Sequence, residues 1–369
     1  MASNRLQELH DAGVAIWLDF IERTMLHNGD LGRRIRDDAV TGMTSNPTIF
    51  EKALAEGSAY DAQLRAAPTD ATPQQLFELV ATTDVRDACD AFRGVYDQTK
   101  GDDGYVSIEV SPGAAHDAKS TLVEARRLWK TVDRPNLLVK VPGTGEGAEA
   151  VRQLIAEGIN VNITLLFAIE AHDRIINAYI SGLEERAKGG QPVDRVYSVA
   201  SFFVSRVDSE IDKRLDGLKR PELKGKAAVA NAKLAYQLFL ERFSSPRWKA
   251  LESKGARVQK PLWASTSTKN PAYRDVMYVE QLIGPRSINT MPPATIDATR
   301  DHADVRRTVD SRVDEARDAM AQLEKAGVSM KEVTDTLLVE GLASFQKSFD
   351  SLIAGLERKR GLVGAGARS

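Results

Sequence analysis

The segment NLLVKVPGTGEG, residues 136–147, joins an apolar run to a glycine-rich turn, and Lys140 lies within the apolar part. Such a short, branched and apolar run is typical of a buried strand. Removing an ammonium group from water is costly, so a lysine directed into a strand-lined interior is either paired with an acid or held as a neutral amine. A neutral amine is a nucleophile that can attack a ketone or aldehyde and form a Schiff base. The segment therefore predicts a strand, and the rest of the chain must show whether Lys140 is a reactive amine or is paired with an acid.

Further runs of the same kind occur along the chain, and longer amphipathic segments separate them. The runs are Val14–Leu18, Val40–Thr44, Tyr105–Val110, Asn136–Val141, Asn160–Thr164, Val196–Ala200, Pro261–Ala264 and Ser287–Thr290. The helical segments between them include Ala118–Lys130, Gly147–Ala156, Ala168–Glu185 and Lys226–Phe243. Alternating strands and helices are the pattern of repeated βα units. Eight such units favour an α/β fold of the closed (β/α)8 TIM barrel type, with additional helices.

The 369 residues exceed a minimal barrel, and two segments carry the excess. Residues 72–99 predict one or two extra helices after the second strand, with Thr72-Pro73 as cap and first turn. Residues 309–358 are strongly helical and are expected to pack outside the barrel. Because barrels of this class often use this much chain as one unit, we expect a single domain over residues 1–360. Residues 361–369 are expected to form a mobile tail.

The composition excludes several classes of function. The net charge is −2, so no broad basic field favours nucleic acid or an anionic membrane, and an anionic substrate must be bound by local groups. Cys89 is the single cysteine, which excludes an internal disulfide and a multi-thiolate metal site and suits a reducing, cytoplasmic compartment. The five histidines lack metal-ligand spacing, so no metal site is predicted. No stretch approaches the roughly 20 apolar residues of a membrane span, so a soluble protein is expected.

Polar residues follow the predicted strands at their carboxyl ends, where the active sites of TIM barrels gather. In strand order they are Asp19, Asn46, Glu109, Lys140, Asn162, Thr164, Ser201, Ser265 and Thr290. Because alternate residues of a strand share a face, Asn162 and Thr164 are expected to point into the barrel together, as are Ser107 and Glu109. One lysine, two carboxylates and several amide and hydroxyl groups therefore converge.

This set of groups suits a lyase or transferase that works through a Schiff base. The amine of Lys140 would attack the carbonyl, a carboxylic acid would help water leave, and a second carboxylate would remove the proton whose loss breaks a carbon–carbon bond. Glu109 and Asp19 are the candidates for the two acids. Each residue also has a structural interpretation: Lys140 as a strand-end cation or ion-pair partner of Glu109, and Asp19 as a helix cap.

The motifs are also similar to those of a known family. The chain resembles transaldolase through TSNP at 44–47, SIEVSP at 107–112 and LVKVP at 138–142. The similarity continues through NVNITL at 160–165 and SFFVSRVD at 201–208, and it covers roughly residues 13–300 in the same order. This resemblance implies a barrel enzyme without a metal or organic cofactor, in which Lys140 forms the covalent intermediate.

The resemblance also implies a reaction of the pentose phosphate pathway on sugar phosphates. A three-carbon dihydroxyacetone unit would pass from sedoheptulose 7-phosphate or fructose 6-phosphate to glyceraldehyde 3-phosphate or erythrose 4-phosphate. Asp19 would act as the base on the substrate hydroxyl, and Glu109 and Thr164 would transfer protons through a water. The residues that would hydrogen-bond the hydroxyls of the held fragment are Asn46, Asn162 and Ser201.

Arg206 would bind the phosphate, a role that suits a guanidinium fork in a chain without a net positive field. One stretch departs from the family pattern. In the best-known members a second arginine closely follows the serine of the seventh strand, whereas here Ser265 is followed by Thr266-Ser267-Thr268-Lys269. Ser267 or Lys269 must take that place, and we favour Lys269. A lysine orients a phosphate more loosely than an arginine does.

Other functions remain open from the sequence. An aldolase of the same mechanism would release dihydroxyacetone, depending on how easily water reaches the enamine. Residues 143–148, GTGEGA, fit the turn of an NAD-dependent oxidoreductase, although the following strand ends in Asn162 and Thr164 and not in an acid for the ribose. A barrel that only binds sugar phosphates would leave Lys140 and the acids without a role. The oligomeric state is also open, a homodimer included.

Overall fold

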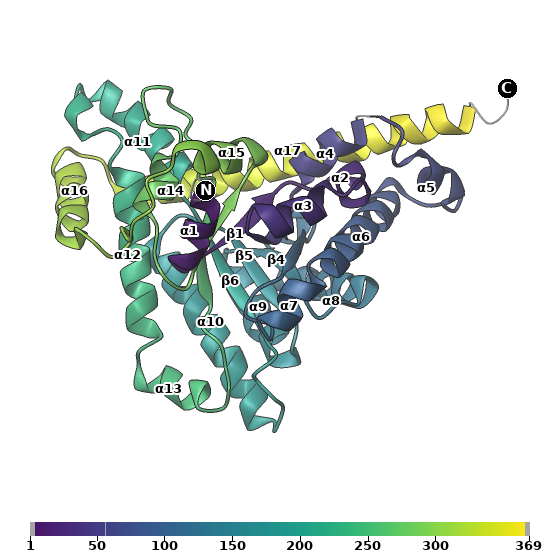
Figure 1. Cartoon of the computed structure of the whole chain (residues 1–369), viewed down its shortest axis with the longest axis horizontal. Helices are drawn as coiled ribbons and strands as arrows, with labels where there is room; N and C mark the ends of the chain where they lie inside the picture. Colours follow the sequence, from purple (N-terminus) through teal and green to yellow (C-terminus); the bar gives the residue numbers. More distant parts are fainter. Residues whose placement is uncertain (1–3, 56, 366–369) are drawn as a thin grey trace.

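The computed structural model describes residues 4–55 and 57–365 (Figure 1). Its centre is a closed barrel of parallel strands in which each strand pairs with the next and β8 pairs with β1. The strands are β1 (Val14–Asp19), β2 (Val40–Thr44), β3 (Val106–Glu109), β4 (Leu137–Pro142), β5 (Val161–Leu166), β6 (Ser198–Phe203), β7 (Lys260–Ala264) and β8 (Ser287–Met291). Every predicted strand overlaps an observed one, and the (β/α)8 barrel is confirmed.

Both faces of the strands are buried, which explains why they appear in the sequence as apolar runs. In β4, Leu137, Val139 and Val141 belong to the core between the barrel and its helices. Leu138, between them, belongs to the cluster inside the barrel. Lys140 is two residues further on, so the same alternation directs it into the barrel.

Helices surround the barrel and extend beyond it. They are α1 (Arg5–Asp11), α2 (Arg23–His27), α3 (Asp30–Asp37), α4 (Pro47–Ala55), α5 (Asp61–Ala66), α6 (Pro73–Ala91), α7 (Arg93–Gln98), α8 (Ala118–Val132), α9 (Gly145–Glu157), α10 (Ile169–Lys188), α11 (Ser205–Gly217), α12 (Ala227–Arg242), α13 (Pro246–Glu252), α14 (Met277–Gln281), α15 (Pro293–His302), α16 (Val313–Lys325) and α17 (Met330–Ala365), with 3-10 turns η1 (Pro112–Ala114) and η2 (Pro221–Leu223). Among the described residues, no helix combines the length and apolarity needed to cross a bilayer.

The segment expected to carry extra helices, residues 72–99, holds α6 and α7. Helix α6 starts with a capping box: the Thr72 side chain accepts from the Gln75 N–H, and the Gln75 side chain accepts from the Thr72 N–H. These bonds satisfy N–H groups that the first turn of a helix leaves unpaired. The start of α6 is therefore encoded locally.

The C-terminal helix α17 is the longest element and crosses the barrel instead of completing a βα unit. Figure 1 shows it in yellow, running past α4 and continuing beyond the barrel toward the C-terminus. It contacts α4, α5, α6 and α11, and also the end of β5. Residues 361–365 continue this helix, whereas residues 366–369 of the expected mobile tail lie outside the described residues. A single domain over residues 1–360 stays a prediction.

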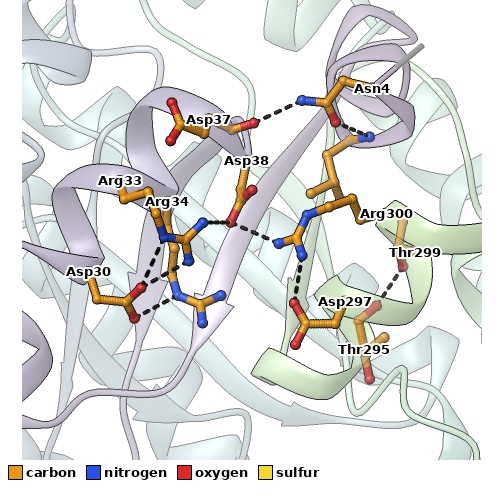
Figure 2. Close-up of polar contacts among 11 residues, drawn as sticks. Asn4, Asp30, Arg33, Arg34, Asp37, Asp38, Thr295, Asp297, Thr299 and Arg300 are labelled. Atoms are coloured by element: carbon orange, nitrogen blue, oxygen red, sulfur yellow. Dashed lines mark hydrogen bonds and ion pairs between the residues drawn. The ribbon is translucent and has the colours of Figure 1, made fainter. Parts of the chain in front are cut away.

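Polar contacts hold the barrel together where its first and last units meet (Figure 2). Asp38, buried just after α3, accepts hydrogen bonds from Arg33 at 3.1 Å and from Arg300 of α15 at 2.9 Å. Asn4 Nδ2, next to α1, donates to the carbonyl oxygen of Asp37 at 2.8 Å. Because α3 follows β1 and α15 follows β8, the Arg300–Asp38 bond joins the two ends of the ring.

Aromatic side chains fill the barrel below the carboxyl ends of its strands. Trp17 is fully buried, and its Nε1 donates to Asp103 Oδ1 at 2.9 Å. Gly42 on β2 makes room for the indole, because a Cβ there would lie 2.5 Å from Trp17 Nε1. The rings of Tyr105 and Tyr197 stack with their centroids 4.5 Å apart. The barrel interior is therefore a packed core beneath the residues at the strand ends.

Candidate active site

The residues predicted to form the site gather at the carboxyl ends of the strands, around a cavity of about 480 Å³. Those that line it are Asp19, Asn46, Glu109, Lys140, Thr164, Ser201, Arg206, Ser265 and Lys269. Asn162 is completely buried and is not part of the cavity lining. Barrel closure therefore brings together groups that are far apart in the sequence.

Lys140 reaches into this cavity from β4. Its Nζ donates to the backbone oxygen of Ser45 at 3.2 Å and lies 3.4 Å from Glu109 Oε2. Glu109 is the partner of Lys140 in the β3–β4 ladder, so strand pairing puts the two side chains side by side. Only 8% of each side chain is exposed. An amine and a carboxyl group held this close and away from bulk water can exchange a proton directly.

The two carboxyl groups of the cavity have raised pKa values. Burial raises the pKa of Glu109, the charge of Lys140 opposes this rise, and the charge of Asp19 adds to it. Burial likewise raises the pKa of Asp19, against the effects of Lys140 and of a hydrogen bond from Thr44. Both groups therefore hold a proton at a higher pH than free carboxyl groups, which is what acid–base catalysis near neutral pH requires.

Two of the expected hydrogen-bonding residues are held by other side chains. Ser201 Oγ donates to Asn162 Oδ1 at 2.7 Å, and Asn162 Nδ2 donates to Ser107 Oγ at 3.0 Å. Asn162 therefore orients Ser201 from outside the cavity. Asn46 lines the cavity, but its Oδ1 also accepts from the backbone N–H of Ile49 at 3.0 Å and so caps α4. Asn46 therefore both caps α4 and lines the cavity.

Two cations mark one side of the cavity. The guanidinium carbon of Arg206 lies 5.3 Å from the centre of the Phe203 ring, and Lys269 Nζ donates to Ser267 Oγ at 2.8 Å. Burial lowers the pKa of both cations, and the charge of Arg206 lowers that of Lys269 further, so the two lie near each other. Within the described residues, neither forms an ion pair with a carboxylate. Neighbouring cations without a counter-ion suit a dianionic phosphate.

The backbone at two strand ends adopts an uncommon conformation. Leu165, after the centre of β5, has a φ of 61°, and Ser265, directly after β7, has a φ of 57°. Both residues line the cavity, and Ser265 Oγ shares a hydrogen bond with Ser205 Oγ at 2.9 Å. Left-handed backbone in residues other than glycine is strained, and such strain clusters at functional sites.

The glycine-rich turn after β4 has a packing role. A Cβ at Gly143 would lie 2.4 Å from Leu166, and one at Gly147 would lie 2.0 Å from the carbonyl oxygen of Pro142. Thr144 Oγ1 accepts from the Gly147 N–H at 3.0 Å and caps α9. These contacts account for Gly143 and Gly147 without a bound dinucleotide. In the part of the chain that the structure describes, no cluster of His, Cys, Asp and Glu side chains could hold a metal ion.

Several cavity residues escaped the sequence interpretation. Those from α17 are Gly341, Ser344, Phe345 and Ser348, and α4 contributes Lys52. Thr44 also lines the cavity, and it hydrogen-bonds Thr290, which the sequence does indicate as a polar strand end. The contact between the two threonines has no local signal in the sequence. No local signal shows that α17 lies over the strand ends, because an amphipathic pattern gives a helix and not its position.

Comparison with known proteins places the chain in a family. A sequence model of the family described as Transaldolase/Fructose-6-phosphate aldolase matches residues 16–356. The protein named Transaldolase from Thermobifida fusca (strain YX) is 49% identical, over 94% of this chain and 96% of its own length. Transaldolase from Trichodesmium erythraeum (strain IMS101) is 47% identical, over 97% of this chain and 98% of its own length. The similarity seen in the motifs is thus confirmed, and the chain belongs to the transaldolase/fructose-6-phosphate aldolase family.

Proposed function

We propose that the protein is a transaldolase, a transferase that moves a dihydroxyacetone unit between sugar phosphates through a Schiff base on Lys140. The observation that carries this proposal is the distance of 3.4 Å between Lys140 Nζ and Glu109 Oε2 in a cavity that Arg206 and Lys269 also line. A buried amine beside an acid suits carbonyl chemistry, and nearby cations suit a phosphorylated substrate. The names of the relatives support the same activity.

In the first proposed step, the neutral amine of Lys140 attacks the C2 ketone of the ketose phosphate. The proton that the attacking nitrogen loses passes through water to the C2 oxygen, which gives the carbinolamine. Glu109 begins as the acid, because burial raises the pKa of this carboxyl group, and it then protonates the C2 hydroxyl. That hydroxyl leaves as water, the protonated imine forms, and Glu109 becomes a carboxylate that regains its proton when the product imine is hydrolysed. Thr164 lines the same cavity and is proposed to hold the water through which this proton moves.

In the second proposed step, Asp19 takes the proton of the C4 hydroxyl. The C3–C4 bond breaks, its electron pair passes to the imine nitrogen, and an aldose phosphate leaves while the enamine stays on Lys140. Attack of this enamine on the acceptor aldehyde reverses the step, with Asp19 returning the proton. Hydrolysis of the new imine then releases the product ketose. The raised pKa of Asp19 suits a group that must take up and return a proton within one cycle.

The substrates are proposed from the shape and charge of the cavity together with the family. Arg206 and Lys269 would bind the phosphate, and the residues proposed to contact sugar hydroxyls are Asn46, Ser201 and Ser265, with Asn162 acting through Ser201. Sedoheptulose 7-phosphate and fructose 6-phosphate share the carbons near the imine, so one set of contacts can serve both donors. Glyceraldehyde 3-phosphate and erythrose 4-phosphate are the proposed acceptors. We assign the reaction to the pentose phosphate pathway and to the cytoplasm.

An aldolase that releases free dihydroxyacetone is the second candidate, because the matched family is described by both activities. The two reactions share every step up to the enamine and differ in whether water or an aldehyde reaches it. Four residues of α17 line the cavity. We propose that this added wall limits the access of bulk water to the enamine and so favours transfer over release.

Trapping of the imine tests the proposal. Borohydride reduction in the presence of fructose 6-phosphate should add a three-carbon fragment to Lys140, and mass mapping should find it on that residue alone. Lys140→Met should lose the adduct, whereas Lys260→Met should keep it, since Lys260 is a buried lysine that bonds to Asp102 and does not line the cavity. An intact protein that gives no adduct on Lys140 would rule out the Schiff base.

Product analysis separates the two candidates. The enzyme is mixed with fructose 6-phosphate, with and without erythrose 4-phosphate, and free dihydroxyacetone is measured together with sedoheptulose 7-phosphate. A transaldolase should form sedoheptulose 7-phosphate and release little dihydroxyacetone when the acceptor is present. Release at an unchanged rate in the presence of the acceptor would assign the protein as an aldolase.

A further inference from the structure

Three neighbouring strands form a chain of hydroxyl groups that ends on Asp19. Thr290 Oγ1 on β8 lies 2.7 Å from Thr44 Oγ1 on β2, and Thr44 Oγ1 donates to Asp19 Oδ1 on β1 at 2.7 Å. Strand β1 lies between the other two, so the side chains of its neighbours meet in front of it. All three residues line the cavity. The chain is therefore part of the site and not of the outer core.

The direction of these hydrogen bonds follows from counting protons. An ionised carboxylate can only accept, so the single proton of the Thr44 hydroxyl must point at Asp19. Thr44 then has lone pairs and no proton for Thr290, so Thr290 must be the donor between the two threonines. Each hydroxyl in the chain thus points its proton toward Asp19, and such aligned bonds strengthen one another.

Burying two hydroxyl groups costs free energy unless both are hydrogen-bonded. The exposed fraction is 2% for Thr44 and 4% for Thr290, so bulk water reaches neither freely. A valine would occupy almost the same space without a hydroxyl to satisfy, and valine is a usual residue of inward-facing barrel positions. The hydroxyls are instead bonded to each other and to one carboxylate oxygen. Among the described residues no donor reaches the second oxygen, Asp19 Oδ2, which leaves it for a substrate hydroxyl.

We propose that Thr44 and Thr290 are positioning residues that act as one unit: they hold Asp19 by its Oδ1, keep it in the ionised form and direct its Oδ2 at the substrate. This inference rests on the proposed function, in which Asp19 takes the proton of the C4 hydroxyl. Burial favours the protonated acid, and the hydrogen bond from Thr44 opposes it. Thr290 acts one hydrogen bond further away. It donates to the Thr44 hydroxyl and polarises it, and that hydroxyl in turn donates to Asp19.

The pH dependence of kcat tests this inference. A base works only when ionised, so kcat falls on the acid side as pH passes through the pKa of Asp19. Loss of the Thr44 donor in Thr44→Val should raise that pKa and move the acid limb up by about one pH unit, roughly a tenfold loss of kcat below the limb. Thr290→Val should shift the limb in the same direction by a smaller amount, with KM little changed. Thr290→Ser keeps the hydroxyl and should restore the wild-type profile.

A matched control removes a buried hydroxyl elsewhere. Thr121 on α8 is buried and donates to the backbone oxygen of Ala114 at 2.7 Å, away from the cavity, so Thr121→Val should leave the pH profile unchanged. If Thr290→Val folds poorly, Thr290→Ala removes the same hydroxyl without adding a methyl group against its neighbours. An acid limb that stays in place in Thr44→Val and in a Thr290 variant would overturn the inference.

Borohydride trapping separates this inference from the proposed function. Reduction in the presence of free dihydroxyacetone requires imine formation but no cleavage of a carbon–carbon bond, so it does not need Asp19. The Thr44 and Thr290 variants should therefore give the same adduct on Lys140 as the wild type does. A normal adduct with an unshifted pH profile rejects the positioning role alone. A wild-type protein without any adduct rejects the proposed function and the inference together.

Discussion

A buried histidine, His172, is expected to make the folded protein less stable in mild acid. His172 lies on α10, is fully buried, and packs against the ring of Phe202 with 5.7 Å between ring centroids. Within the described residues neither ring nitrogen has a hydrogen-bond partner. Burial lowers the pKa of His172 from 6.5 to about 4, and the nearby charge of Asp173 opposes this only partly. The folded protein therefore holds His172 in its neutral form.

The stability effect follows from the difference between the two states. The unfolded chain binds a proton at a pKa of 6.5 and the folded chain at about 4, so acid favours the unfolded chain. The contribution of neutral His172 to the free energy of unfolding is fully present above pH 6.5, and it is lost as the pH falls toward 4. At about 1.36 kcal/mol per pKa unit, the full loss is about 3 kcal/mol, of which about 2 kcal/mol falls between pH 7.5 and pH 5.0.

The assay compares the free energy of urea unfolding at pH 7.5 and pH 5.0. His172→Leu fills a similar volume without a titrating group, so its loss of stability on acidification should be smaller than that of the wild type by about 2 kcal/mol. His116→Leu, at an exposed position, is the matched control and should follow the wild type. Equal pH dependence in wild type and His172→Leu would refute the reasoning, because it would mean that His172 is protonated or solvated in the folded state.

Two further changes test the packed interior of the barrel and the proposed phosphate contact of Arg206. Gly42→Ala should destabilise the protein by about 1–3 kcal/mol in urea unfolding, because the new Cβ would lie 2.5 Å from Trp17 Nε1 in a packed interior. Gly94→Ala is the control, because Gly94 has open space around it and the substitution should cost far less stability. Arg206→Lys should raise KM for fructose 6-phosphate about tenfold or more and leave Schiff-base trapping of free dihydroxyacetone unchanged, because a lysine cannot form the two parallel bonds of a guanidinium. An unchanged KM would remove Arg206 from the phosphate site.

The strands were predictable because their pattern is local. A strand with both faces buried is apolar along its whole length, as in β4, and the turn chemistry of Pro142 and Gly143 marks where it ends. The capping box at Thr72 is likewise visible in four residues. The position of Lys140, Glu109 and Asp19 followed from the fold, since barrels collect the residues that follow their strands at one end.

Contacts between side chains from distant strands were not predictable. The Thr44–Thr290 bond joins β2 to β8 across β1, and the burial of Asn162 behind Ser201 depends on how β5 and β6 pair. Strand tilt and register decide both, and neither leaves a trace in a single strand's sequence. The ambiguity between Ser267 and Lys269 also belongs here, because the structure brings both side chains into the cavity and bonds one to the other.

Sequence alone determined the number and order of the strands, the polar groups at their ends and the similarity to a family, since each depends on residue type and spacing along the chain. Tertiary structure alone decided which of those groups touch: the short distance from Lys140 to Glu109, the hydroxyl chain on Asp19 and the residues of α17 that line the cavity. The reason is physical. Burial and hydrogen bonding act over a few ångströms in space, and only strand pairing and closure of the barrel bring residues that are 25 to 246 positions apart within that range.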